Sequence, residues 1–257
     1  MSLNPADSRP RYQQLAALLR EQIETGELAE GDRVPTEAEL ADRYGASRNT
    51  VRLALGRLRA EGLLISQQGK GSFVRSDGPI KYYASLSGSR QRRLAADRRL
   101  DTFGQQVQAH GKVPKQVSTT KVIPAAGEIA TRLALEPGDE IGVRRRVQYA
   151  DDEPIQLGDS YYPYAIVRDS KIMNPADVPE GTDQVLEDLG YTPVHYADEI
   201  TWRMPTNAEA TKLHMEQGIP VGRLLRTSYD PSDRPIEVYE VIMPANLHAL
   251  LYEVSAE

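Results

Sequence analysis

The sequence of 257 residues contains no cysteine, and this absence excludes a disulfide framework, a thiolate metal site and a thiol nucleophile. No apolar run approaches the ~18 residues that a membrane-spanning helix needs, and the N-terminus has no apolar signal-peptide core. We therefore expect a cytoplasmic protein that has no membrane partner.

Histidine is also scarce, and the four histidines are scattered without the spacing of metal ligands. The sequence shows no pairing of a nucleophile with a base and no glycine-rich phosphate loop. We therefore assign no metal site, no cofactor and no catalytic residue. A length of 257 residues with 40% apolar content is enough for two modest domains.

The segment 47–62 carries the strongest single pattern. Ser47 can cap the N-terminus of a helix and Gly62 stands at its end. Apolar residues recur between them at helical spacing: Val51, Ala54, Leu55 and Leu58. Residues 47–75 hold six basic side chains and one acidic one, a local charge of +5 in a chain of net charge −6. Such a helix is either a DNA recognition helix or an amphipathic surface helix.

The neighbouring segments favour DNA recognition. Residues 10–25 show a helical apolar pattern, and Thr36 and Glu39 match a capping box that begins a second helix. Gly45 and Ala46 then turn the chain into the third helix, as in a helix-turn-helix. Residues 63–66 and 72–74 read as two strands around a glycine-rich turn, which predicts a wing with Lys70 at its tip.

The stretch PTEAELADRYGASRNTVRLALGRLRAEGLLISQQGKGSFV resembles the winged helix-turn-helix of GntR-type bacterial transcription regulators, over about residues 10–75. The resemblance implies that the third helix meets phosphates and base edges and that the wing enters the minor groove. Ala38 stands where many members carry a DNA-contacting arginine, so the operator need not be the common one. We assign these residues to DNA binding: Thr36, Ser47, Arg48, Asn49, Thr50, Arg52, Gln68, Gly69, Lys70 and Gly71.

Domain boundaries are expected at the turn 76–79, which gives a DNA-binding domain over 1–76, a basic linker over 77–100 and a second domain over 101–257. The linker holds six basic residues against Asp97 in 81–99. It either lies near the phosphate backbone or forms a solvated helix on the acidic second domain.

The second domain contains an internal repeat. The segment from Pro124 to Pro163 can be laid over the segment from Pro205 to Pro244, with an offset of about 80 residues. Each unit reads helix, turn, strand, turn, strand. Two such units predict an α+β domain in which one antiparallel sheet has approximate two-fold symmetry.

Equivalent positions in the two units are expected to face a cleft between them. Arg146 and Arg226 lie in mid-strand, where a buried charge needs a carboxylate, a ligand anion or an exposed edge. Glu237 is a natural partner, and Tyr161 and Tyr239 could line the cleft. A structural ion pair or an outward strand face is the alternative for each.

The segments RRRVQYADDEPIQLGDSYYP and RLLRTSYDPSDRPIEVYE resemble the UTRA effector-binding domain of the HutC branch, which has a chorismate-lyase-like fold. The resemblance implies a small-molecule pocket, for which we assign Arg146, Gln148, Tyr161, Arg226, Glu237 and Tyr239. Members that bind phosphorylated sugars often carry two arginines two residues apart. We place the second of these positions at Gln148, and the glutamate position that follows in such members at Gly158. These departures leave open an effector that is less anionic than a phosphorylated sugar, or larger and more apolar.

Together these patterns predict a dimeric repressor that binds a two-fold symmetric double-stranded operator and responds to a small effector of unknown identity. A constitutive repressor with a degenerate pocket is one alternative. A lyase-like enzyme fused to a DNA-binding domain is another, and it rests on fold analogy alone.

Overall fold

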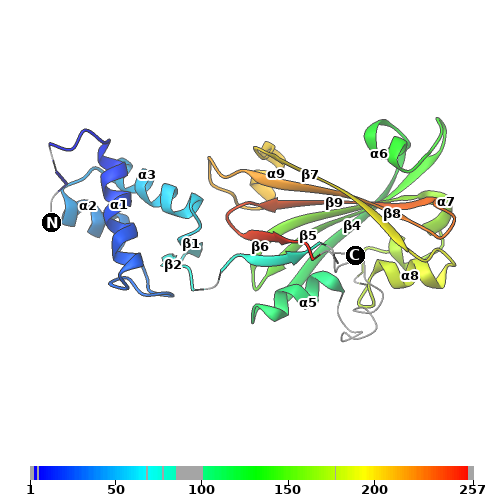
Figure 1. The fold of residues 1–257 in the computed structure, drawn as a ribbon, viewed down its shortest axis with the longest axis horizontal. Helices are drawn as coiled ribbons and strands as arrows, with labels where there is room; N and C mark the ends of the chain where they lie inside the picture. The colour runs from blue at the N-terminus through cyan, green and yellow to red at the C-terminus, as the bar shows by residue number, and fades with distance from the viewer. Residues whose placement is uncertain are drawn as a thin grey trace. The chain divides into compact units, whose positions relative to one another are not determined.

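The computed structural model describes residues 3–4, 6–67, 69–76, 78–84, 101–176 and 178–253 (Figure 1). Unit 1 comprises Met1–Pro79 with Glu216–Ile219, and unit 2 comprises Ile80–Met215 with Pro220–Glu257. The predicted DNA-binding residue Gln68 and residues 77 and 85–100 of the predicted linker lie outside the described residues. Within the described ranges, no helix is long and apolar enough to cross a bilayer, and no cluster of three metal-ligating side chains occurs.

Unit 1 contains three helices followed by a two-stranded hairpin, as the sequence predicts. The helices are α1 (Arg11–Glu24), α2 (Glu37–Tyr44) and α3 (Arg48–Ala60). The antiparallel strands β1 (Leu64–Gln67) and β2 (Gly71–Val74) form the wing.

Side-chain caps fix the starts of α2 and α3. The hydroxyl of Thr36 accepts the backbone N–H of Glu39 (3.3 Å), and the Glu39 carboxylate accepts the backbone N–H of Thr36 (2.7 Å). The hydroxyl of Ser47 likewise accepts the backbone N–H of Thr50 (3.1 Å). Between the two helices, Gly45 has a φ of 59°, a conformation that glycine adopts without strain.

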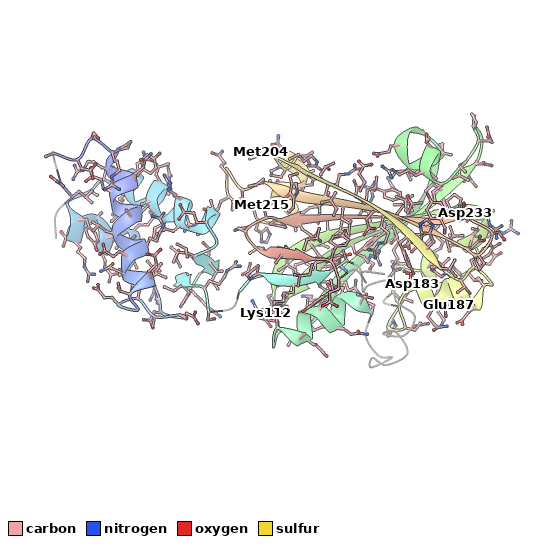
Figure 2. All side chains as sticks on the ribbon, in the orientation of Figure 1. Lys112, Asp183, Glu187, Met204, Met215 and Asp233 are labelled. Carbon is pink, nitrogen blue, oxygen red and sulfur yellow. The ribbon has the colours of Figure 1, made fainter. Side chains whose placement is uncertain are left out.

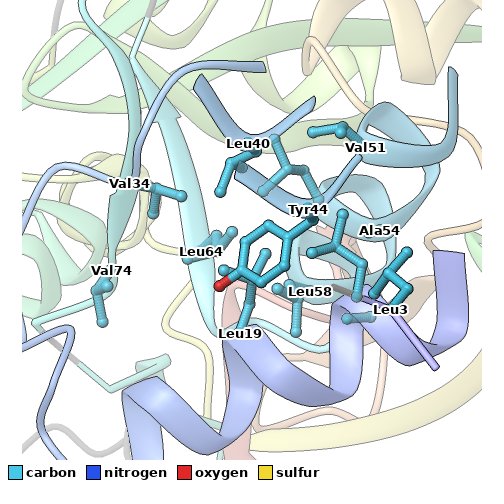
Figure 3. Close-up of a cluster of buried hydrophobic side chains, with 13 residues drawn as sticks. Leu3, Leu19, Val34, Leu40, Tyr44, Val51, Ala54, Leu58, Leu64 and Val74 are labelled. Carbon is cyan, nitrogen blue, oxygen red and sulfur yellow. The ribbon is translucent and has the colours of Figure 1, made fainter. Parts of the chain in front are cut away.

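One apolar core joins the three helices and the wing (Figure 3). Each element contributes at least one fully buried side chain, among them Leu19, Leu40, Val51, Leu58, Leu64 and Val74. Because α3 uses one side for this core, its other side is left to solvent.

Unit 2 is built on a six-stranded antiparallel sheet in the order β4-β5-β6-β9-β8-β7. The strands are β4 (Pro114–Pro124), β5 (Glu140–Ala150), β6 (Glu153–Pro163), β7 (His195–Arg203), β8 (Val221–Tyr229) and β9 (Pro235–Pro244). The α+β class and the internal duplication that the sequence predicts are thereby confirmed.

The two halves, β4-α6-β5-β6 and β7-α9-β8-β9, agree in backbone detail. Helices α6 (Gly127–Arg132) and α9 (Asn207–Lys212) occupy equivalent positions. Ala134 and His214, 80 residues apart, have φ values of 51° and 49°, and both hairpins have a register shift, after Gln148 and after Ser228. Each half also begins with a strand, β4 or β7, that the sequence analysis did not predict. These edge strands have one exposed side and no apolar run.

The sheet is covered on both faces, and Figure 1 shows α6 on the side opposite α5 and α8. Apolar side chains of α6 and α9 pack on one face. The elements on the other face are α5 (Thr102–Ala109), α7 (Tyr164–Val167), η1 (Lys171–Met173) and α8 (Thr182–Asp188), with β3 (Ile80–Tyr83) paired in parallel to β10 (His248–Leu251). Residues 80–83, which the sequence analysis placed in a linker, are therefore a strand of unit 2.

Leu58 tests how strongly the core holds α3. It is completely buried, so Leu58→Ala should destabilise unit 1 by about 2–5 kcal/mol. Leu53 on the same helix is 47% exposed, and Leu53→Ala should change the stability little. Hydrogen exchange of the α1 and α3 amides measures both, with amides of unit 2 as the internal reference. Equal protection in the two variants would contradict the packing described above.

Candidate functional site

Polar side chains occupy the outer side of the first turns of α3. Ser47, Arg48, Asn49 and Arg52 are exposed, and Thr50 is half-buried. The guanidinium of Arg52 donates to the Asn49 amide oxygen (2.8 Å), which holds the two side chains together. Arginine and asparagine side chains at the start of such a helix can reach base edges in the major groove.

The arginines of this region differ in their partners. Arg57 and Arg20 both bind the carboxylate of Glu61, at 3.0 and 2.5 Å. Across the part of the chain that the structure describes, Arg48 and Arg52 have no carboxylate within ion-pair distance. No ion pair within the described residues therefore neutralises their charges.

The wing presents its backbone and one cation. Gly69 and Gly71 have φ values of 73° and 113°, so the turn depends on glycine, and Lys70 at its tip is exposed. A Cβ atom at Gly71 would lie 3.2 Å from Nε of Arg33. Thr36 is exposed too, but its hydroxyl is engaged in the cap of α2.

In unit 2, one face of the sheet is lined with polar side chains, and we call it the polar face. Alternate residues of a strand share a face, and the strand register brings these side chains together. The polar face carries Arg144, Arg146, Gln148, Gln156, Ser160, Tyr162, Arg226, Ser228, Glu237 and Tyr239. It is the face covered by α5, α8 and the β3–β10 pair.

The structure brings together five of the six residues assigned to effector binding but not Tyr161. Arg146, Gln148, Arg226, Glu237 and Tyr239 lie on the polar face. Tyr161 pairs with Val143 on the opposite face, where it packs against α6. Burial raises the pKa of its hydroxyl. Its neighbour Tyr162 occupies the polar face instead, because successive strand residues point to opposite sides.

Arg226 has its counter-ion within the protein. Its guanidinium binds the Asp198 carboxylate through two hydrogen bonds of 2.7 Å and donates to the carbonyl of Ala84 (2.5 Å). Burial alone would lower the pKa of Arg226, but the bonds to Asp198 raise it well above the ordinary value. The charge of this arginine is therefore balanced within unit 2.

Arg146, the equivalent of Arg226 in the first half, has no such carboxylate within the described ranges. Its Nε donates to the Gly158 carbonyl (3.1 Å) and its Nη2 to the Ser160 hydroxyl. Ser118 stands opposite it on β4, where β7 places Asp198. Burial alone would lower the pKa of Arg146. Acidic groups nearby, Tyr239 first and also Glu237, hold its pKa above the ordinary value.

Glu237 lies on the same face and is also buried. Its carboxylate accepts the hydroxyl of Tyr162 (2.7 Å) and lies 3.5 Å from that of Ser228. Burial raises the pKa of Glu237, and Asp183 of α8 (Figure 2) adds repulsion, while Arg146 acts in the opposite direction. A buried acid and a buried base therefore share the polar face without an ion pair between them.

Tyr239 closes one side of Arg146. The guanidinium lies 5.2 Å from the centre of the Tyr239 ring, a cation–π distance. The ring lies against Gly158, where a Cβ atom would be 2.6 Å from the tyrosine hydroxyl and 2.9 Å from the Gln148 amide oxygen. Gly158 is therefore required for the close approach of Tyr239.

Arg144 is a polar-face residue that the sequence analysis missed. Its guanidinium donates to the carbonyls of Asn174 (2.5 Å), Ala176 (2.7 Å) and Ile172 (3.3 Å), so it holds the segment after η1 on the sheet. The signal was present, because residues two apart on a strand share a face and Arg144 precedes Arg146 by two. Arg144 and Arg146 thus lie two residues apart on the polar face, and position 148, where the resemblance places the second family arginine, is a glutamine.

Comparisons with known proteins agree with this two-unit organisation. The family model of bacterial regulatory proteins of the gntR family matches residues 11–74, and that of the UTRA domain matches residues 108–249. The mannosyl-D-glycerate transport/metabolism system repressor MngR of Escherichia coli is 30% identical, over 86% of this chain and 80% of its own. The transcriptional repressor NagR of Bacillus subtilis is 29% identical, over 89% and 88%. The crystal structure of PhnF from Mycobacterium smegmatis, 20% identical, has a TM-score of 0.61 over 95% of this chain and all of its own.

The contact between Gly158 and Tyr239 can be tested by substitution. Gly158→Ala should destabilise unit 2 by about 1–3 kcal/mol, because the added methyl group overlaps the tyrosine hydroxyl. Gly78→Ala is the matched control, since a Cβ atom there meets nothing within 4 Å. Urea unfolding measures both, and Tyr239→Phe should recover part of the loss in the Gly158 variant. Two alanine variants of equal stability would refute the contact.

Proposed function

The chain belongs to the GntR family of bacterial regulatory proteins and carries a UTRA domain, and we propose that it acts as a dimeric repressor. It is a DNA-binding transcription regulator, and its relatives MngR and NagR are repressors. We infer two copies on a two-fold symmetric operator, because one α3 helix supplies too few base contacts for genomic specificity. This action places the protein in the cytoplasm with the chromosome.

The proposed DNA-reading surface consists of the exposed N-terminal part of α3 and the wing. Its support is the contrast between paired Arg57 and unpaired Arg48 and Arg52. A basic surface within a protein of net charge −6 concentrates the affinity for DNA in one region. Thr36 contributes to this surface by capping α2, because its backbone N–H and its hydroxyl are hydrogen-bonded to Glu39.

The proposed effector site is the part of the polar face around Arg146. The observation that carries it is the contrast between Arg226, which forms an ion pair with Asp198, and Arg146, which has no carboxylate within ion-pair distance in the described ranges. A buried guanidinium without a counter-ion favours an anionic ligand. Glu237 adds an acceptor for a hydroxyl or ammonium group. We infer an effector that carries an acidic group beside polar donors, such as an acidic sugar derivative.

The name of one relative supports this inference. MngR is named for the mannosyl-D-glycerate system, and mannosyl-D-glycerate is a sugar derivative with a carboxylate. Coupling to DNA requires that the effector bind the DNA-competent and DNA-incompetent arrangements unequally.

A fluorescence titration of the full-length protein against the DNA upstream of its own gene tests the proposal. The titration is repeated at two salt concentrations and with pairs of metabolites that differ only in the acidic group, such as sugar phosphates and the free sugars. Selective binding that acidic members change and neutral members do not would support both halves of the proposal. Selective binding that no metabolite changes would favour the constitutive repressor.

Arg52 and Lys70 should differ in what they contribute to DNA binding. Arg52→Ala should lower specific affinity by on the order of 1 to 3 kcal/mol and relax the preference at one base pair. Lys70→Ala should weaken binding to all sequences alike. It should also reduce the slope of log affinity against log salt concentration by about one, because one phosphate contact is lost. Anisotropy titrations with specific and scrambled duplexes measure both effects. Unchanged specific affinity in Arg52→Ala would remove α3 from the proposed interface.

Arg146→Gln should leave operator binding intact and lower the affinity for the effector about ten- to hundredfold, because a charge-assisted hydrogen bond is lost. Arg145→Gln is the matched control. Arg145 lies on the opposite face, where it binds Asp159, so its substitution should leave the response unchanged. Thermal shift and operator-release titrations measure the response. A normal response in the Arg146 variant would place the effector elsewhere.

A further inference from the structure

Leu53 is an apolar side chain in the middle of the polar outer side of α3. It is 47% exposed, and in the described part of unit 1 it is the one large apolar residue with such exposure. Val51, Ala54, Leu55 and Leu58 of the same helix are buried. Leu53 therefore does not serve the core.

Helix geometry places Leu53 within the proposed DNA-reading surface. Residues four apart lie on one side of a helix, so Leu53 follows Asn49 by one turn and precedes Arg57 by another. Arg52, its neighbour in sequence, is fixed to Asn49 by the 2.8 Å hydrogen bond. A helix that lies in the major groove with Asn49 and Arg52 at the bases brings Leu53 to the same groove floor.

The chemistry of the groove identifies the partner of Leu53. The edges of the base pairs in the major groove present hydrogen-bonding groups and a single apolar group, the C5-methyl of thymine. The unpaired charges of Arg48 and Arg52 beside Leu53 favour a polyanion over an apolar protein surface.

We infer that Leu53 is a specificity-determining residue that contacts the methyl group of a thymine next to the base pair read by Arg52. The inference rests on the proposed function, because it requires α3 in the major groove. It adds direct recognition of one A·T pair in each half-site to the polar contacts proposed above.

Replacing thymine by deoxyuridine removes the methyl group and keeps every hydrogen-bonding group, so it isolates this contact. A binding sequence is first selected by the full-length protein from a random duplex library. Each thymine of that sequence is then replaced singly by deoxyuridine, and anisotropy titrations measure the affinity of wild type, Leu53→Ala and Leu53→Met.

For the wild type, one thymine per half-site should show about a fourfold loss on replacement, the equivalent of one buried methyl group. Leu53→Ala should bind the thymine and deoxyuridine duplexes equally well. Leu53→Met keeps an apolar side chain and should retain most of the discrimination. Hydrogen exchange of the α1 and α3 amides serves as the control that all three proteins are folded.

The outcomes separate this inference from the proposed function. Selection of no sequence by the wild type would overturn both. A selected sequence in which every thymine replacement affects wild type and Leu53→Ala alike would overturn the role of Leu53 and leave DNA recognition by Arg48 and Arg52 in place.

Discussion

Burial of guanidinium groups on the polar face is the constraint on which unit 2 depends. Removing an arginine from water is costly unless its donors are satisfied, and the face holds three buried arginines. Backbone carbonyls satisfy Arg144, and Asp198 with a carbonyl satisfies Arg226. Arg146 has a carbonyl, a hydroxyl and an aromatic ring, which solvate it without neutralising it. The protein itself satisfies the first two arginines, and the third is the one around which we propose the effector site.

The internal duplication explains how one sheet holds both kinds of arginine. The halves keep the same strand order, the same hairpin bulges and the same helix position, so equivalent residues can be compared directly. They differ where the counter-ion stands, with Ser118 in one half and Asp198 in the other. They differ again where Tyr239 of the second half lies against Gly158 of the first. The second half supplies a carboxylate to its arginine, Arg226. The first half supplies none within ion-pair distance to Arg146 in the described ranges.

Local signals in the sequence were sufficient for the three helices of unit 1, the wing and the repeat, because capping residues and apolar spacing act within a few residues of the chain. They were insufficient where tertiary contacts decide. Strands β4 and β7 carry few apolar residues and exist through pairing with β5 and β8. Which face Tyr161 and Arg144 occupy depends on the strand register, because alternate residues of a strand share a face. Arg144, Arg145 and Arg146 are consecutive, as are Tyr161 and Tyr162, so the sequence does not show which of them point to the polar face. The DNA-contacting residues of α3 and the wing stay a prediction.

The polar face also receives the chain that leaves unit 1. Strand β3 follows that unit directly, pairs with β10 and ends at Tyr83. The carbonyl of the next residue, Ala84, accepts a hydrogen bond from Arg226. The ion pair of Arg226 with Asp198 thus anchors the entry of the chain on the same face that carries Arg146. Allosteric coupling needs contacts that differ between two states. A ligand at Arg146 would contact the same polar face on which Arg226 holds Ala84. Of the two equivalent arginines, Arg226 holds the start of unit 2 on the sheet, and Arg146 is the one that we propose for the ligand.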